Sequence, residues 1–167
     1  SNYGHVGEQF VWATDCEHVR LNPYQVTFKA QDNGNPVNLV SLHTLQIQVV
    51  APAPQQLQTL PSENSIFLSW QPSPCSSLAK GYKIYRKVEP SGFVPMHCQT
   101  GVPQFTGFQQ IAITTDTFFI DDNASKGLLH GMEYCYMVIA YFSDGAESYA
   151  SNESCTILKQ SIPIITH

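Results

Sequence analysis

The sequence lacks long apolar runs and a strong charge of either sign. Its longest apolar stretches are about eight residues, well short of the roughly 20 that a helix needs to cross a bilayer. The net charge is -5 at pH 7, and the basic cluster at 80–87 lies on an alternating stretch, where it would keep one strand face soluble. We therefore expect neither insertion into a membrane nor a nucleic-acid-binding surface.

Motifs for catalysis and metal binding are also missing. The six histidines show no His-x-x-x-His or Glu-x-x-His spacing, and no Gly-x-Ser-x-Gly elbow, phosphate-binding loop or dinucleotide fingerprint occurs. Asp121 and Asp122 are adjacent acids, but neighbouring residues at a strand end point apart, and the sequence that follows is typical of a turn. We therefore expect no enzyme activity, no metal site and no cofactor.

Cysteine is present, but never as C-x-x-C. The spacing is unlike that of zinc or redox sites and is typical of disulfides in a secreted protein. It predicts an extracellular or cell-surface protein, and the alternative is a cytosolic protein with buried free thiols. The five cysteines are Cys16, Cys75, Cys98, Cys135 and Cys155.

The main positive signal is apolar alternation with a period of two. In the stretch 128–142, Tyr134, Tyr136, Val138 and Ala140 fall at every second position, so they share one face of a strand. Helix is scarcely supported, and the predicted fold class is all-β. Ile66, Leu68 and Trp70 show the same period at 65–70, and further strands are expected at 82–88, 108–113 and 117–121.

Several stretches resemble the fibronectin type III domain. The pattern Leu-x-x-Gly-x-x-Tyr-x-Tyr that ends at Tyr136 is similar to its F strand, in which a tyrosine, here Tyr134, forms the tyrosine corner. Trp70-Gln-Pro resembles the end of strand B, and residues 81–86 resemble strand C. The resemblance covers residues 53–160 and implies an immunoglobulin-like β-sandwich with these three aromatic residues in structural roles.

The segment 1–53 contains three candidate strands, at 9–13, 24–30 and 44–50. They resemble the closing hairpin of an immunoglobulin-like or cadherin-like sandwich. Because three strands cannot bury two sheet faces, we expect the missing strands in an upstream segment. The predicted organisation is a partial β segment (1–50), a stiff proline-rich linker (51–54), a fibronectin type III domain (55–160) and a tail or the start of a further linker (161–167).

Asp32 lies in Ala-x-Asp-x-Gly-x-Pro, a pattern that resembles cadherin repeats, in which the aspartate helps to hold calcium. A calcium ion needs six to eight oxygen ligands, and the linker at 49–54 lacks the acidic segment of that family. We therefore favour Asp32 as a turn-forming residue, and a calcium ligand is the alternative.

The segment 89–107 is longer than the turn that the family places after strand C. Its aromatic residues and a neighbouring tyrosine are candidates for stacking on sugar rings or anchoring a protein partner. The alternative, which we favour, is that the insertion folds its phenylalanines onto the sheet as a small second core. The candidate binding residues are Phe93, Phe105, Phe108 and Tyr85.

Two disulfides can be proposed from the sequence. Cys135 and Cys155 are equidistant from Gly145, the centre of the turn expected between two antiparallel strands, so they should face each other. Cys75 and Cys98 can meet if the insertion runs back along strand C. Cys16 is then left to pair with an upstream segment or to remain a free thiol.

The stretch 15–30, the proline-rich segment 49–54 that follows it, and the stretch 144–153 of the cysteine-containing module together resemble large bacterial surface proteins that are associated with gliding motility. This resemblance implies a non-catalytic structural or adhesive module. The expected partners are neighbouring domains of the same chain and, in addition, an extracellular polysaccharide or surface protein. The rival hypothesis is a carbohydrate- or protein-binding module that uses the insertion at 89–107.

Overall fold

The computed structural model describes residues 7–97 and 99–159, and this part of the chain is all-β, as predicted. It contains three short 3-10 helices and no α-helix, and none of its helices has the length and apolarity needed to span a membrane. The 3-10 helices are η1 (Cys16–His18), η2 (Ser76–Leu78) and η3 (Gln104–Thr106). The strands are β1 (Tyr24–Gln31), β2 (Val40–Ile47), β3 (Gln55–Ser62), β4 (Ser65–Gln71), β5 (Gly81–Val88), β6 (Gln109–Thr114), β7 (Phe118–Asp121), β8 (Glu133–Tyr141) and β9 (Ser154–Ile157).

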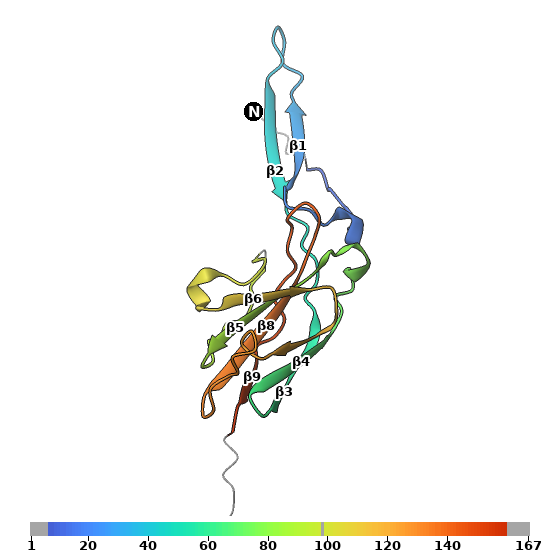
Figure 1. The fold of residues 1–167 in the computed structure, drawn as a ribbon. Coiled ribbons are helices and arrows are strands. Elements are labelled where there is room, and N and C mark those ends of the chain that lie inside the picture. The colour runs from blue at the N-terminus through green and yellow to red at the C-terminus, as the bar shows by residue number, and fades with distance from the viewer. Residues whose placement is uncertain (1–6, 98, 160–167) are drawn as a thin grey trace, which may run out of the picture.

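A three-stranded and a four-stranded sheet form a two-layer sandwich. The strand orders are β3-β4-β7 and β6-β5-β8-β9, and neighbouring strands are antiparallel. The hairpin of β1 and β2 is a separate two-stranded sheet that projects from one end of the sandwich (Figure 1). The boundaries of the predicted domains remain predictions.

The core between the two layers contains the side chains that strand alternation predicts. Trp70 of β4 and Tyr134 of β8 are each 5% exposed, and Ile84 of β5 is completely buried. The Trp70 ring meets Tyr82 edge to face at 5.4 Å between ring centroids. The tyrosine corner is confirmed, because the Leu129 N–H donates to the Tyr134 hydroxyl at 3.0 Å. Burial of each large apolar side chain contributes roughly 1.5–3 kcal/mol, so this core dominates folding.

The outer face of β8 is buried as well. Cys135, Met137 and Ile139 are completely buried, because the insertion crosses this face and packs Phe93 and Phe108 against it. Strand alternation places Tyr85 and Tyr141 on outer strand faces, but both are only partly exposed. The second core that we favoured for the insertion is therefore present.

The second strand of the hairpin differs from its prediction. β1 agrees with the predicted strand at 24–30, but its partner β2 (40–47) begins four residues and ends three residues before the predicted strand at 44–50. The reason is the loop, in which the Asp32 carboxylate accepts the N–H groups of Gly34 and Leu39 and so brings Gln31 opposite Val40. This is the turn-forming role that we favoured for Asp32.

Residues 9–13 are not a strand. They pack on one face of the hairpin through aromatic edges, with Phe10 against Phe28 and Trp12 against Tyr24 at centroid distances of 6.3 and 4.6 Å. The apolar residues of this segment therefore reflect its packing on the hairpin and not a strand of its own.

The proline-rich segment 51–54 is docked on the sandwich. Ala51 is completely buried, and its carbonyl accepts the Tyr149 N–H at 3.0 Å. The Pro52 carbonyl accepts the Ser73 hydroxyl at 2.6 Å. The segment is therefore held against the domain that follows it, which gives more stiffness than its prolines alone.

The predicted disulfide between Cys135 and Cys155 is confirmed. The two residues are direct register partners in the β8-β9 pair, and Gly145 lies in the turn between the strands with φ of 91°. Closing a loop of this length contributes about 3 kcal/mol in the chain-entropy model.

Candidate functional site

The four predicted binding residues divide into supporting and exposed positions. Phe108 is 7% exposed and belongs to the second core, against which Tyr85 and Phe93 pack. Burial, together with the nearby Glu147 carboxylate, raises the pKa of Tyr85 to about 12, so its hydroxyl stays protonated. These three side chains support the insertion from below.

Phe105 is the predicted residue that reaches the surface. It is 77% exposed and meets the edge of Phe93 at a centroid distance of 5.9 Å. Val94 and Met96 of the same insertion are 76% and 71% exposed. The insertion therefore presents apolar side chains to solvent, and the binding role of Phe105 stays a prediction.

A glutamate outside the insertion fixes its first turn. The Glu153 carboxylate accepts the N–H and hydroxyl of Ser91 and the N–H of Gly92, at 2.7, 3.1 and 3.0 Å. Glu153 also lies near the sulfurs of Cys135 and Cys155, which is a grouping of metal-ligand types. Because both sulfurs are in a disulfide and the carboxylate is occupied by three donors, this group is a structural anchor.

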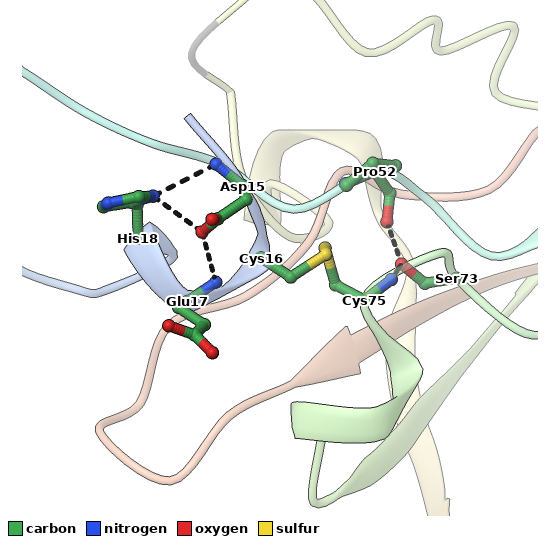
Figure 2. The surroundings of a disulfide bond; sticks show 7 residues. All are labelled: Asp15, Cys16, Glu17, His18, Pro52, Ser73 and Cys75. Carbon is green, nitrogen blue, oxygen red and sulfur yellow. Dashed lines mark hydrogen bonds and ion pairs between the residues drawn. A yellow bond between two sulfur atoms is a disulfide. The ribbon is translucent and has the colours of Figure 1, made fainter. Parts of the chain in front are cut away.

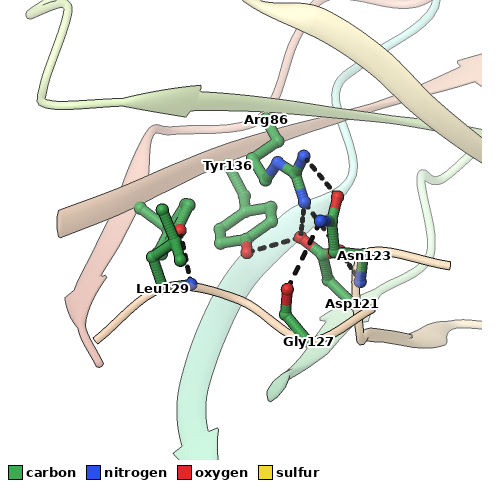
Figure 3. A network of polar contacts seen from close by, with 7 residues as sticks. Arg86, Asp121, Asn123, Gly127, Leu129 and Tyr136 are labelled. Carbon is green, nitrogen blue, oxygen red and sulfur yellow. Dashed lines mark hydrogen bonds and ion pairs between the residues drawn. The ribbon is translucent and has the colours of Figure 1, made fainter. Parts of the chain in front are cut away.

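The main buried polar network in the described part of the chain links β5, β7 and β8, and so ties the two sheets together (Figure 3). Arg86 of β5 donates to both carboxylate oxygens of Asp121 of β7 at 2.9 Å, and the Tyr136 hydroxyl of β8 donates to Asp121 at 2.8 Å. Burial raises the pKa of Tyr136, and the Asp121 charge raises it further. A tyrosine held protonated in a satisfied network has a structural role and is not a general base.

The joint between the hairpin and the sandwich contains the second disulfide, which joins Cys16 to Cys75 (Figure 2). Cys16 begins η1, whose first turn is capped by the Asp15 carboxylate, which accepts the Glu17 N–H at 3.0 Å. Cys75 follows β4 and is 3% exposed, and its N–H is 3.3 Å from the Ser73 hydroxyl oxygen, which accepts it.

The predicted pairing of Cys75 with Cys98 is therefore wrong, as is the expectation that Cys16 pairs upstream or stays free. The prediction treated the segment 1–53 as a separate unit, so it gave Cys16 no way to reach the sandwich. In the structure this segment folds back over the end of β4, where Cys75 lies. Cys98 lies outside the described residues.

Packing and hydrogen bonds surround this disulfide. Cys16 and Val19 pack against the buried cluster of Ala51, Cys75, Phe142 and Ala146. The Leu21 N–H donates to the Asp144 carboxylate at 2.8 Å, which joins the N-terminal segment to the turn after β8. The Gln48 side chain donates to the Arg20 carbonyl at 2.6 Å. The disulfide, the packing and these hydrogen bonds together hold the N-terminal segment against the sandwich. The sequence signals for this joint were the odd number of cysteines and the turn residues Asp144 and Gly145.

No family model and no curated protein matches the chain. Similar solved structures include domains A168–A170 of titin, the fibronectin type III domain of human fibronectin type III domain containing protein 3, and a β-1,2-glucanase from Parabacteroides distasonis, with TM-scores of 0.48, 0.46 and 0.45 and identities of 16%, 19% and 18%. The matches cover 84%, 68% and 75% of this chain, and 56%, 91% and 16% of those chains. The chain thus spans about half of the titin structure, and these likenesses concern the fold alone.

The fold is a fibronectin type III-like sandwich. Its two-layer β-sandwich, core tryptophan and tyrosine corner are those that the sequence resemblance implies. The carboxylates of Asp121 and Glu153 both have donors from other segments of the chain.

The Arg86–Asp121–Tyr136 network gives a first prediction. Asp121→Asn should lower the free energy of unfolding by about 2–4 kcal/mol, because it leaves the partly buried Arg86 guanidinium without its anionic partner. Tyr136→Phe is the matched control: it removes one hydroxyl and should cost about 1–2 kcal/mol. Urea unfolding measures both, and equal small losses would contradict the network's role.

The buried Phe108 and the exposed Phe105 give a second prediction. Phe108→Ala should destabilise the protein by about 3 kcal/mol, because it leaves a cavity against β8. Phe105→Ala should change stability by no more than about 0.5 kcal/mol, because its ring is mostly in solvent. Thermal and urea unfolding of the two variants test this, and a comparable loss in both would show that Phe105 is also a core residue.

Asp144 gives a prediction of pH dependence. The N–H groups of Leu21 and then Ala146 lower the pKa of its carboxyl group. The contact therefore contributes fully above the ordinary aspartate pKa of about 4 and is lost as the pH falls through the lowered value. The amide signal of Leu21 in NMR spectra should titrate below about pH 4 and should lose this titration in Asp144→Asn. A flat Leu21 signal in the unmodified protein would contradict the contact.

Proposed function

We propose that this chain is a non-catalytic structural and adhesive module of a secreted, multidomain bacterial surface protein, of the kind associated with gliding motility. The observation that carries the proposal is the joint of Cys16, Cys75 and their surrounding contacts, which fastens a projecting hairpin to a fibronectin type III-like sandwich. Such a part sets the direction of one segment relative to the next. Its expected neighbours are further domains of the same chain.

The two disulfides support this proposal, because they indicate an oxidising environment. The two disulfides close loops across the joint and across the β8-β9 pair, with sequence separations of 59 and 20 residues. Disulfides persist in extracellular and periplasmic environments and are rare in the reduced cytosol. The module therefore functions outside the cell or at its surface.

The exposed apolar residues supply the adhesive part of the proposal. Phe105, Val94 and Met96 project from an insertion whose base is fixed by a buried core. Because the insertion is already ordered, binding a partner through these side chains would lose little conformational entropy. An aromatic ring so presented can stack on a sugar ring or enter a pocket of a surface protein. Extracellular polysaccharide or a surface protein is the partner class that fits.

The experiment that tests the structural role compares the motion of the two parts. In the oxidised protein, amide ¹⁵N relaxation should give the same rotational correlation time for β1-β2 and for β4 and β8, because the joint is closed. In Cys16→Ser/Cys75→Ser the hairpin should tumble faster than the sandwich. Cys135→Ser/Cys155→Ser is the matched control, since it removes a disulfide within the sandwich and leaves the joint intact.

Independent tumbling of the hairpin in the oxidised, unmodified protein would overturn the proposal. Adhesion is tested separately by a glycan array and by capture of surface proteins, with the unmodified protein and with Phe105→Ala. Loss of a signal in the variant supports the adhesive surface, and the absence of any signal with the unmodified protein removes it.

A further inference from the structure

The two disulfides decide which parts of the chain can carry tension. A force applied before Cys16 and after Cys155 follows the shortest covalent path, which runs from Cys16 through the disulfide to Cys75, along the chain to Cys135, and through the second disulfide to Cys155. The segments 17–74 and 136–154 are closed loops beside this path. They cannot be extended while the disulfides are intact.

We infer that the module is load-bearing, that the disulfides shield the hairpin and β3-β4 from tension, and that β5 and β8 form its mechanical clamp. This inference rests on the proposed structural role, in which neighbouring domains pull on the module. The hairpin is the part that most needs shielding, because two strands alone are marginally stable in water. Its exposed side chains would then keep their arrangement under load.

The geometry of the clamp follows from the strand register. β5 and β8 are antiparallel neighbours over eight residue pairs, from Gly81 opposite Tyr141 to Val88 opposite Tyr134. Tension from Cys75 enters β5 at the Gly81 end. Tension from Cys155 enters β8 at Cys135, which is opposite Lys87 near the other end.

The two strands are therefore pulled from opposite ends, along their own direction. In this shear arrangement, all backbone hydrogen bonds of the pair must break together, whereas pulling both strands from one end would break them one at a time. The pair is also central in its sheet, with β6 beside β5 and β9 beside β8. Burial of both faces of β8 adds side-chain packing that must be lost in the same step.

Single-molecule stretching tests this inference, because each disulfide changes the length released on unfolding. With both disulfides intact the releasable chain runs from Cys75 to Cys135, about 210 Å at about 3.5 Å per residue. With both reduced it runs from Cys16 to Cys155, about 490 Å. Each observed gain is smaller by the distance already spanned in the folded state.

The two double variants give intermediate lengths and serve as controls for each other. Cys16→Ser/Cys75→Ser should release about 420 Å of chain, and Cys135→Ser/Cys155→Ser about 280 Å. In the latter, tension reaches β8 through the β8-β9 pair, which has four residue pairs in place of eight, so the unfolding force should fall by about half. Cys98→Ser in each of these chains prevents thiol exchange, and one further oxidised chain, with all five cysteines, retains Cys98.

A long release of about 490 Å from the oxidised protein would overturn the inference. An unfolding force that is unchanged in Cys135→Ser/Cys155→Ser would do the same. A release of about 340 Å from the oxidised chain that retains Cys98 would show a Cys75–Cys98 bond and would overturn it too. The relaxation experiment is independent of these lengths. A rigid joint with the wrong lengths rejects load bearing alone, and a loose joint rejects the structural role.

Discussion

The crosslink between Cys16 and Cys75 is the constraint on which the arrangement of this protein depends. A ribbon of two strands buries too little apolar surface to fix its own position, so something else must hold β1 and β2 in place. The Cys16–Cys75 disulfide closes a loop with a sequence separation of 59 residues. In the chain-entropy model, a loop of this length adds about 4 kcal/mol to the free energy of unfolding. The packing of Val19 and the bond from Leu21 to Asp144 then select one orientation among those that the crosslink allows.

A second constraint is the position of β8 between two cores. Strand alternation usually separates a buried face from a wet one, but here Tyr136 and Val138 point to one core while Met137 and Ile139 point to the other. The insertion makes this possible by covering the outer face, and Glu153 holds the start of the insertion in place. A length of chain that looks like a free loop in the sequence is thus part of the fold.

The sandwich could be predicted from the sequence, because its information is local. Period-two alternation gave the inner residues of β4, β5 and β8, and equal distances from Gly145 gave the Cys135–Cys155 pair. The partner of Cys75 could not be found in this way. It depends on the path of residues 7–23 over the end of the sandwich, and a path that is set by packing among distant segments has no periodic signal. For the same reason, the second hairpin strand was placed four residues late: the Asp32 carboxylate, and not the apolar pattern, sets that register.

The roles of the carboxylates also depend on contacts between distant segments of the chain. Asp121 and Glu153 look like reactive groups when they are read as isolated acids, but each accepts several donors from segments that it joins. An ionised carboxylate has about four lone-pair sites, and fixed donors occupy three of them in Glu153. The two carboxylates therefore act as crosslinks: Asp121 between the two sheets, and the partly buried Glu153 between the insertion and the segment before β9. Together with the two disulfides they tie both ends and the outer face of the sandwich.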